Sequence, residues 1–263
     1  MKFSVKSLFL FTVLAALLCM TGLASADSLA DIKAKGVMTV GTSADYPPYE
    51  FKDANDQFTG FDMELINEVG KRMGVKINIV DMGFDALIAS LQNGKVDAVI
   101  AAMQASAERD KVVDFSKVYH NIKDAFLVKA GSGITMKSPY DAAGKKIAVQ
   151  TGTIQEKWVQ ANLVDTGKTK AEDVFSYERV DQAAMDVAAG RVDVLFIISD
   201  PAKSHAEKAG LEIALVTGET VSAGQSIAIP EGSTELKAAI DSAIDSMVAD
   251  GTMKKLMDKY GLF

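Results

Sequence analysis

The sequence predicts an α/β fold with two similar lobes. Short β-rich runs alternate with helical stretches from residue 27 onward, and this alternation indicates βαβ units with right-handed crossovers. Two apolar runs, 97–102 and 193–198, each follow a helix, a glycine, a basic residue and a valine. Helix–glycine–strand joints also occur by coincidence, but the repeated order favours two related α/β lobes.

The first series of elements spans residues 37–102. Its strands and helices follow from apolar residues that recur with the period of a strand or of a helix. The predicted order is a strand at 37–42, a helix at 61–73, a strand at 76–81, a helix at 84–92 and a strand at 97–102. Gly74 ends the first helix. The last strand is apolar throughout, as expected of a buried parallel strand.

The second series and the chain end complete the predicted fold. The elements are strands at 146–150, 173–177, 193–198, 212–216 and 225–229, and helices that begin at Gly152-Thr153 or span 180–189, 235–248 and 252–260. The first lobe would comprise 27–122 and 221–263, and the second 123–220. Two lobes joined by extended segments favour a cleft between them, where small ligands usually bind.

Residues 1–26 have the features of a secretory signal peptide. Lys2 and Lys6 precede an apolar run at 8–20, and Ala-Ser-Ala at 24–26 gives a cleavage pattern. A membrane anchor is the less favoured alternative, because a spanning helix needs about 20 apolar residues. Cys19 lies inside this segment, so the mature chain would contain no thiol. These features predict export to the periplasm.

Charge and motif content favour binding over catalysis. Loss of the two signal-peptide lysines moves the net charge from −7 to −9, which argues against nucleic-acid and anionic-membrane partners. His120 and His205 are the only histidines, and neither has metal-ligand spacing. The sequence lacks GxSxG, HExxH and GxxxxGK[ST] motifs. We therefore expect no catalytic residue, no metal site and no cofactor.

Polar residues follow the first buried strand directly. Ligands of α/β sheets bind outside the carboxyl ends of the strands. Ser106 can cap a short helix there, and Arg109 can hold a carboxylate through two parallel hydrogen bonds. In the alternative interpretation, Arg109 is a surface residue paired with Asp110 or Asp114.

Two other strand ends carry similar features. Gly152 and Thr153 follow a strand and open a helix, which would let backbone N–H groups approach a ligand; an ordinary capped turn is the alternative. The segment 46–49 (YPPY) places Tyr46 near the same rim, unless it forms a rigid turn with a core aromatic. The convergence of three strand ends favours a binding site.

A set of motifs spread over the mature chain has a familiar order. They are 41–51 (GTSADYPPYEF), 59–65 (TGFDMEL), 84–97 (FDALIASLQNGKVD), 105–109 (ASAER), 112–116 (VVDFS), 144–153 (GKKIAVQTGT) and 250–252 (DGT). Together they resemble periplasmic amino-acid-binding proteins of ABC importers, solute-binding protein family 3. The resemblance implies a two-lobed Venus-flytrap fold with two hinge strands, which traps its ligand by closing.

The resemblance also implies roles for individual residues. Arg109 would bind the ligand carboxylate, with help from the Ser106 hydroxyl, and the Ala102 carbonyl would face the ligand amine. The remaining implied ligand contacts are Tyr46 and Phe84 as aromatic walls, Gly152, Thr153 and Gln155 from the second lobe, and Ser43, Gln104 and Gln150 around the ligand side chain.

One position departs from the family pattern. Family members carry an acid at the end of the last strand of the second lobe, where it pairs with the ligand ammonium, and Ile198 stands there. Either Asp200 supplies the charge through a local bulge, or the ligand lacks a conventional α-ammonium. Ser43 stands where some members with basic ligands carry an acid, which argues against arginine, lysine or histidine.

These features predict a monomeric receptor that delivers a small carboxylate-bearing ligand, an amino acid, to a membrane permease. A first alternative is an enzyme, since the family resembles cyclohexadienyl dehydratases, which use the same fold. A second alternative is a free-standing sensor that reports its ligand to a separate membrane partner.

Overall fold

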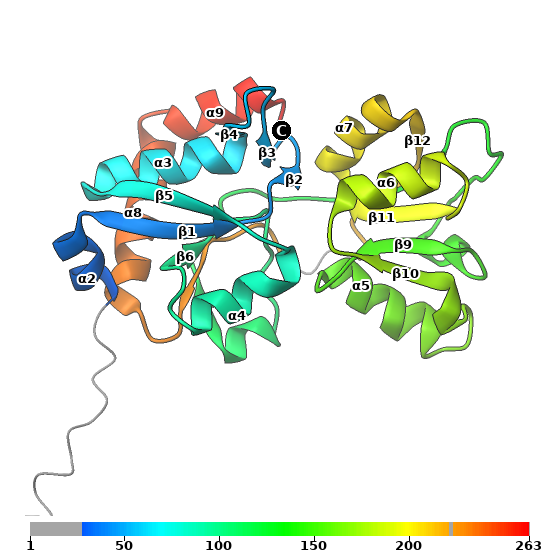
Figure 1. Ribbon diagram of the computed structural model, residues 1–263, viewed down its shortest axis with the longest axis horizontal. Coiled ribbons are helices and arrows are strands. Elements are labelled where there is room, and N and C mark those ends of the chain that lie inside the picture. The colour runs from blue at the N-terminus through cyan, green and yellow to red at the C-terminus, as the bar shows by residue number, and fades with distance from the viewer. Residues whose placement is uncertain (1–27, 221–222, 263) are drawn as a thin grey trace, which may run out of the picture.

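The computed structural model describes residues 28–220 and 223–262. It has two lobes, each built on a five-stranded β-sheet with helices on its faces (Figure 1). The predicted two-lobed α/β fold is thus confirmed. The predicted signal peptide at 1–26 lies outside the described residues. In the part of the chain that is described, no helix is both long and apolar enough to cross a bilayer.

The sheet of the first lobe has the strand order β5-β1-β6-β13-β7. Its strands are β1 (Val37–Thr42), β5 (Lys76–Asp81), β6 (Ala98–Val99), β7 (Val113–Phe115) and β13 (Ala228–Pro230). β1 is parallel to β5 and β6, whereas β13 is antiparallel to β6 and β7. A small antiparallel sheet of β2 (Asp45–Tyr46), β3 (Glu50–Lys52) and β4 (Phe58–Thr59) extends this lobe.

Helices cover both faces of this sheet. They are α2 (Ser28–Lys35), α3 (Phe61–Met73), α4 (Leu87–Gln92), α8 (Thr234–Ala249) and α9 (Thr252–Tyr260), with short 3-10 turns at Phe84–Ala86 and Arg109–Lys111. α3 buries its periodic apolar residues and ends at Gly74, whose φ of 73° requires a left-handed conformation. α4 packs through Leu87 and Leu91 into a second apolar cluster on the opposite face.

The second lobe has the strand order β10-β9-β11-β8-β12. The strands are β8 (Asp124–Lys129), β9 (Ile147–Gln150), β10 (Val174–Tyr177), β11 (Val194–Ile198) and β12 (Leu211–Thr217). The helices are α5 (Ile154–Val159), continued by a π-helical turn at Gln160–Val164, α6 (Val180–Ala188) and α7 (Ser199–Ala209), with 3-10 turns at Pro139–Ala142 and Ala171–Asp173. The rings of Phe126 and Phe196 stack 4.1 Å apart in its core.

The chain crosses between the lobes twice, once between β7 and β8 and once between β12 and β13. The two crossings touch at Gln225, which forms β-bridges with Gln104 and His120. The crossings agree in position with the hinge strands that the resemblance implies. The lobe boundaries near residues 122 and 220 stay predictions.

Two predicted strands differ markedly from the structure, and the first of them ends at the cavity. The strand predicted at 97–102 is only two residues long, as β6. Ala102 has a positive φ of 47°, which turns the chain away from the sheet. The strand predicted at 225–229 begins only at Ala228, because Gln225 pairs with the other crossing instead of extending β13.

Candidate functional site

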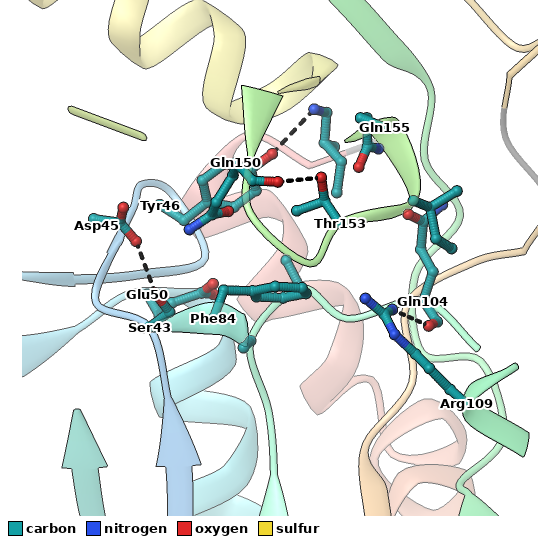
Figure 2. A pocket seen from close by; sticks show the side chains of 14 residues that line it. Ser43, Asp45, Tyr46, Glu50, Phe84, Gln104, Arg109, Gln150, Thr153 and Gln155 are labelled. Atoms are coloured by element: carbon teal, nitrogen blue, oxygen red, sulfur yellow. Dashed lines mark hydrogen bonds between the residues drawn. The ribbon is translucent and has the colours of Figure 1, made fainter. Parts of the chain in front are cut away.

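A cavity lies between the lobes, at the carboxyl ends of their strands (Figure 2). The cavity and its opening to solvent together hold about 340 Å³ of space that no protein atom fills. The first lobe contributes Ser43, Asp45, Tyr46, Glu50, Phe84, Ala101, Ala102, Gln104 and Arg109, and the second contributes Gln150, Thr153, Ile154, Gln155 and Ile198. Most of the residues predicted at strand ends are therefore brought together in one place.

Arg109 is buried in the cavity wall without an anion. Its side chain sits on a 3-10 turn, and the residue is 7% exposed, so the alternative of a surface arginine is wrong. Its Nη1 donates to the carbonyl of Gln104 at 2.6 Å, and its Nη2 donates to the carbonyl of Gly152 at 2.9 Å. Its guanidinium carbon lies 5.3 Å from the centre of the Phe84 ring.

Burial makes this charge costly. Removal from water lowers the pKa of Arg109 to about 10. Among the ion pairs between described residues, none includes Arg109; its neighbour Glu108 pairs with Lys157 instead. Carbonyl oxygens satisfy the N–H groups but do not neutralise the charge. The site therefore suits a ligand that brings an anion, and a carboxylate matches the planar guanidinium.

The Gly152 loop brings the second lobe to Arg109. Gly152 has a φ of 79°, and a Cβ on it would lie 3.1 Å from the Cα of Asp85 in the first lobe. The lobes thus meet through a position that only glycine fits easily. Contrary to the sequence interpretation, the Gly152 N–H donates to Glu156, so the loop presents its carbonyl to Arg109.

Three residues predicted as ligand contacts, Ser106, Gly152 and Asp200, do not line the cavity. The Ser106 hydroxyl accepts the backbone N–H of Arg109 at 3.2 Å, so it positions the arginine. Asp200 accepts a hydrogen bond from Tyr49 at 2.8 Å and lies 3.6 Å from His120 Nε2. Burial opposes ionisation of Asp200, but hydrogen bonds from His120, Tyr49 and Lys203 outweigh it and lower its pKa to about 2.

Ile198 lines the cavity at the end of β11 and brings no charge to it. Its backbone N–H donates to the Tyr46 hydroxyl at 3.0 Å, which ties the lobes together. Asp124, its partner across the strand pair with β8, is the nearby acid. The carboxylate of Asp124 accepts hydrogen bonds from Gln155 and Thr220. No bulge brings Asp200 into the cavity within the described chain.

Sequence reasoning missed two acids in the cavity wall, Asp45 and Glu50. Burial raises the pKa of Asp45 to about 6, although the Val180 N–H and Arg179 oppose this change. Glu50 is 1% exposed, and burial next to Asp62 raises its pKa well above its usual value. The short strand β3 gave no signal for Glu50, because its order of glutamate, phenylalanine and lysine predicts that the glutamate is exposed.

Glu50 and Asp62 form a buried carboxyl pair beneath the cavity. One Asp62 oxygen accepts hydrogen bonds from the Ala102 N–H at 2.8 Å and from Tyr119 at 2.9 Å. Burial raises the pKa of Asp62 to about 6, against these bonds. Two adjacent acids out of water share a proton more readily than they both ionise. We infer that protonated Glu50 donates to Asp62, which in turn holds Ala102 at the cavity.

The carboxyl pair predicts a specific pH dependence of stability. Because both folded-state pKa values are raised, the stabilisation is full below the unfolded-state values near 4 and is lost as pH rises through about 6 and above. Glu50→Gln keeps a donor toward Asp62 at every pH. Between pH 5 and 8, wild type should lose more unfolding free energy than the variant, because only wild type has the titrating Glu50 carboxyl. Urea denaturation measures this, and equal losses would refute the shared proton.

Comparison with known proteins is consistent with this geometry. Residues 38–263 match the family described as bacterial extracellular solute-binding proteins, family 3. The L-cystine-binding protein TcyJ of Escherichia coli K12 is 32% identical over 230 residues, which cover 87% of this chain and 84% of TcyJ. The L-arginine-binding protein of Pseudomonas aeruginosa PAO1 is 30% identical over 246 residues, 90% of this chain and 92% of that protein.

Solved structures show the same architecture. An ancestral arginine-binding protein bound to arginine has a TM-score of 0.80 and 35% identity, and the match covers 86% of this chain and 98% of that one. The ancestral amino-acid-binding protein AncCDT-1, a precursor of cyclohexadienyl dehydratase, has a TM-score of 0.78 and 34% identity, with 89% and 99% covered. This chain belongs to family 3 of the bacterial extracellular solute-binding proteins.

Proposed function

We propose that this chain is the extracytoplasmic receptor of an ABC importer and that it captures an amino acid by lobe closure. The observation that carries the proposal is the buried, unneutralised guanidinium of Arg109 in the cavity between the lobes. Relatives named for binding L-cystine and L-arginine support an amino acid as ligand.

In the proposed complex, the ligand carboxylate takes up the two N–H directions that Arg109 now gives to carbonyl oxygens. Phe84 covers one side of the guanidinium. Ala102, held through its N–H by Asp62, offers its carbonyl to the ligand amine. Because Ile198 supplies no charge, the amine depends on uncharged acceptors, Ala102 and protonated Glu50. The polar side chains of Ser43, Gln104, Gln150, Thr153 and Gln155 would surround the rest of the ligand.

We infer that the lobes are closed in this structure, because several hydrogen bonds join them around the cavity. Tyr46 binds the Ile198 N–H, Asp45 accepts the Val180 N–H at 2.6 Å, and Tyr49 donates to Asp200. Each contact pairs a residue of the first lobe with one of the second. An open form would break these contacts together, so a ligand that bridges the lobes shifts the balance toward the closed form.

A thermal-shift screen of the common L-amino acids and small carboxylates tests the proposal. At least one amino acid should raise the melting temperature by about 5–10 °C at 100 times its dissociation constant, because a ligand that binds only the folded state stabilises it. If every amino acid leaves the melting temperature unchanged while a carboxylate without an amine raises it, the amino-acid proposal fails.

We propose binding without turnover. The structural neighbour AncCDT-1 is itself described as an amino-acid-binding precursor of the dehydratase. The one protonated carboxyl that we infer in the cavity wall, that of Glu50, already directs its proton toward Asp62. Incubating the purified protein with prephenate distinguishes the alternatives, since we expect no loss of prephenate, and turnover would make the chain an enzyme.

The proposal includes a location and a partner. Residues 1–26 would be removed on export, so that the mature chain begins at Asp27 in the periplasm. A monomer in the closed form would then deliver its ligand to a membrane permease. The stand-alone sensor differs only in its membrane partner, and uptake of the bound amino acid by cells separates the two.

A further inference from the structure

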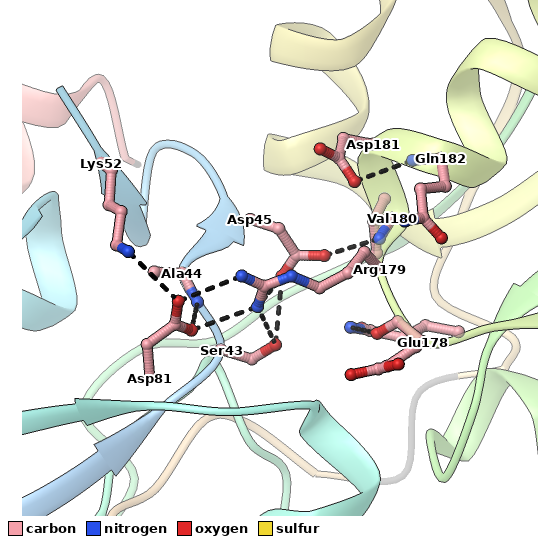
Figure 3. Close-up of polar contacts among 11 residues, drawn as sticks. Ser43, Ala44, Asp45, Lys52, Asp81, Glu178, Arg179, Val180, Asp181 and Gln182 are labelled. Atoms are coloured by element: carbon pink, nitrogen blue, oxygen red, sulfur yellow. Dashed lines mark hydrogen bonds and ion pairs between the residues drawn. The ribbon is translucent and has the colours of Figure 1, made fainter. Parts of the chain in front are cut away.

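Arg179 is a second arginine near the ligand cavity: it does not line the cavity itself, but it contacts two residues that do, Ser43 and Asp45. Figure 2 places Ser43 and Asp45 on one side of the cavity and Arg109 on the other. Figure 3 shows the Arg179 side chain reaching from the start of α6 toward Ser43 and Asp45 in the first lobe. Its Nη1 lies 3.4 Å from the Ser43 hydroxyl. Its side chain is 27% exposed, so water reaches only part of it.

A bidentate ion pair holds this guanidinium in place. Nη1 and Nη2 of Arg179 each lie 3.1 Å from a different oxygen of Asp81, at the end of β5. Asp81 also accepts the Ala44 N–H at 3.0 Å and lies 3.6 Å from Lys52. Two parallel hydrogen bonds to one carboxylate fix the plane of the guanidinium. The pair joins the lobes, so it exists only when they are closed.

The two acids that contact Arg179 face cations of the protein, and a third acid, Asp181, lies near enough to act electrostatically on both Asp45 and Arg179. Asp45 lies 4.0 Å from Arg179, and its two oxygens accept hydrogen bonds from Ser43 and from the Val180 N–H. Asp81 faces both Arg179 and Lys52. The two carboxylates of Asp45 and Asp81 thus lie near two cations, the side chains of Arg179 and Lys52. A cationic ligand group at this end would find paired carboxylates and a like charge beside them.

We propose that Arg179 determines the specificity of the cavity by excluding cationic side chains. This inference rests on the proposed function, because it assumes that Arg109 holds the α-carboxylate. The ligand side chain then extends toward Ser43 and Asp45, and Arg179 is the cation that contacts these two residues. Like charges brought together at an interface disfavour the wrong partner. The ligand is accordingly an α-amino acid with an uncharged side chain, in contrast to the arginine named for several relatives.

Isothermal titration with L-arginine and with L-citrulline, its uncharged near-isostere, tests the charge directly. The best uncharged amino acid from the screen serves as a third probe. Wild type should bind L-citrulline at least tenfold, and the best uncharged ligand at least 100-fold, more tightly than L-arginine. Arg179→Met should reduce both ratios at least fivefold, whereas Arg179→Lys, which keeps the charge, should preserve them.

Asp81→Asn provides a second variant with the opposite expectation. It removes the anion that neutralises Arg179 but keeps one side-chain oxygen as an acceptor, and Arg179 retains its contacts with Ser43 and Asp45. Discrimination against L-arginine should therefore widen at least threefold. Thermal unfolding of each variant checks that it folds. The role of Arg179 would be overturned if the affinity ratio of L-citrulline to L-arginine were unchanged in Arg179→Met, or if this ratio fell in Asp81→Asn.

The outcomes for wild type separate this inference from the proposed function. If wild type binds L-arginine or L-lysine more tightly than every uncharged amino acid, the receptor function stands and the role of Arg179 is overturned. If it binds no amino acid at all, the proposed function fails and the role of Arg179 fails with it.

Discussion

Replacing Arg109 with methionine is expected to weaken amino-acid binding by about 30- to 4,000-fold, as measured by isothermal titration with the ligand found in the screen. Truncating one member of a buried, hydrogen-bonded charge pair costs about 2–5 kcal/mol. Methionine retains much of the volume of the arginine stem, so packing against Phe84 persists while the charge is lost.

Two further variants make the Arg109 result specific. Arg109→Lys keeps the charge but loses the planar pair of donors, so it should recover only part of the affinity. Arg191→Met removes an exposed arginine that pairs with Asp186 away from the cavity, and its affinity should equal that of wild type. Wild-type affinity in Arg109→Met would contradict a ligand carboxylate at this site.

Replacing Gly152 with alanine is expected to weaken ligand binding by about 5- to 150-fold. Its Cβ would meet both the Cα and the Cβ of Asp85 at 3.1 Å, where the two lobes come together. Overpacking a close contact costs about 1–3 kcal/mol, and the cost falls on the closed form because the open form separates the two residues. Titration with the same ligand measures the loss.

Gly167→Ala is the matched control for this variant. Gly167 has a similar φ of 71°, and a Cβ there would meet nothing within 4 Å. Both variants should lose about 1 kcal/mol of unfolding free energy, because alanine resists a left-handed conformation. Only Gly152→Ala should lose affinity. Equal affinities in the two variants would mean that the lobes need not approach at Gly152 to bind ligand.

The regular elements with strong patterns could be predicted from the sequence. β1, β5, α3 and α9 have the predicted bounds, because their apolar residues recur with the period of a strand or of a helix. The sequence analysis missed the helices α2 and α7 and the strands β2, β3, β4, β7 and β8. α7 buries only small or polar residues, such as Ala202 and His205. Its helical form therefore depends on packing against β8, β11 and β12 more than on periodicity.

The candidate site was predictable where it depends on strand ends. Arg109, Tyr46 and Gln150 follow or end strands, and the fold brings the carboxyl ends of those strands to one cavity. Contacts between distant residues could not be read from the sequence. The Val180 N–H orients the carboxylate of Asp45 through a hydrogen bond. The position of Arg179 depends on its ion pair with Asp81, which lies 98 residues earlier in the chain.

The central claim is that Arg109 receives a ligand carboxylate between the closed lobes. A crystal structure of the protein with the amino acid from the screen tests it most directly, through the distance between the guanidinium nitrogens and the ligand. We expect both terminal nitrogens of Arg109 within about 3 Å of the carboxylate oxygens. A bound ligand whose carboxylate lies elsewhere, with Arg109 still donating to Gln104 and Gly152, would contradict the account.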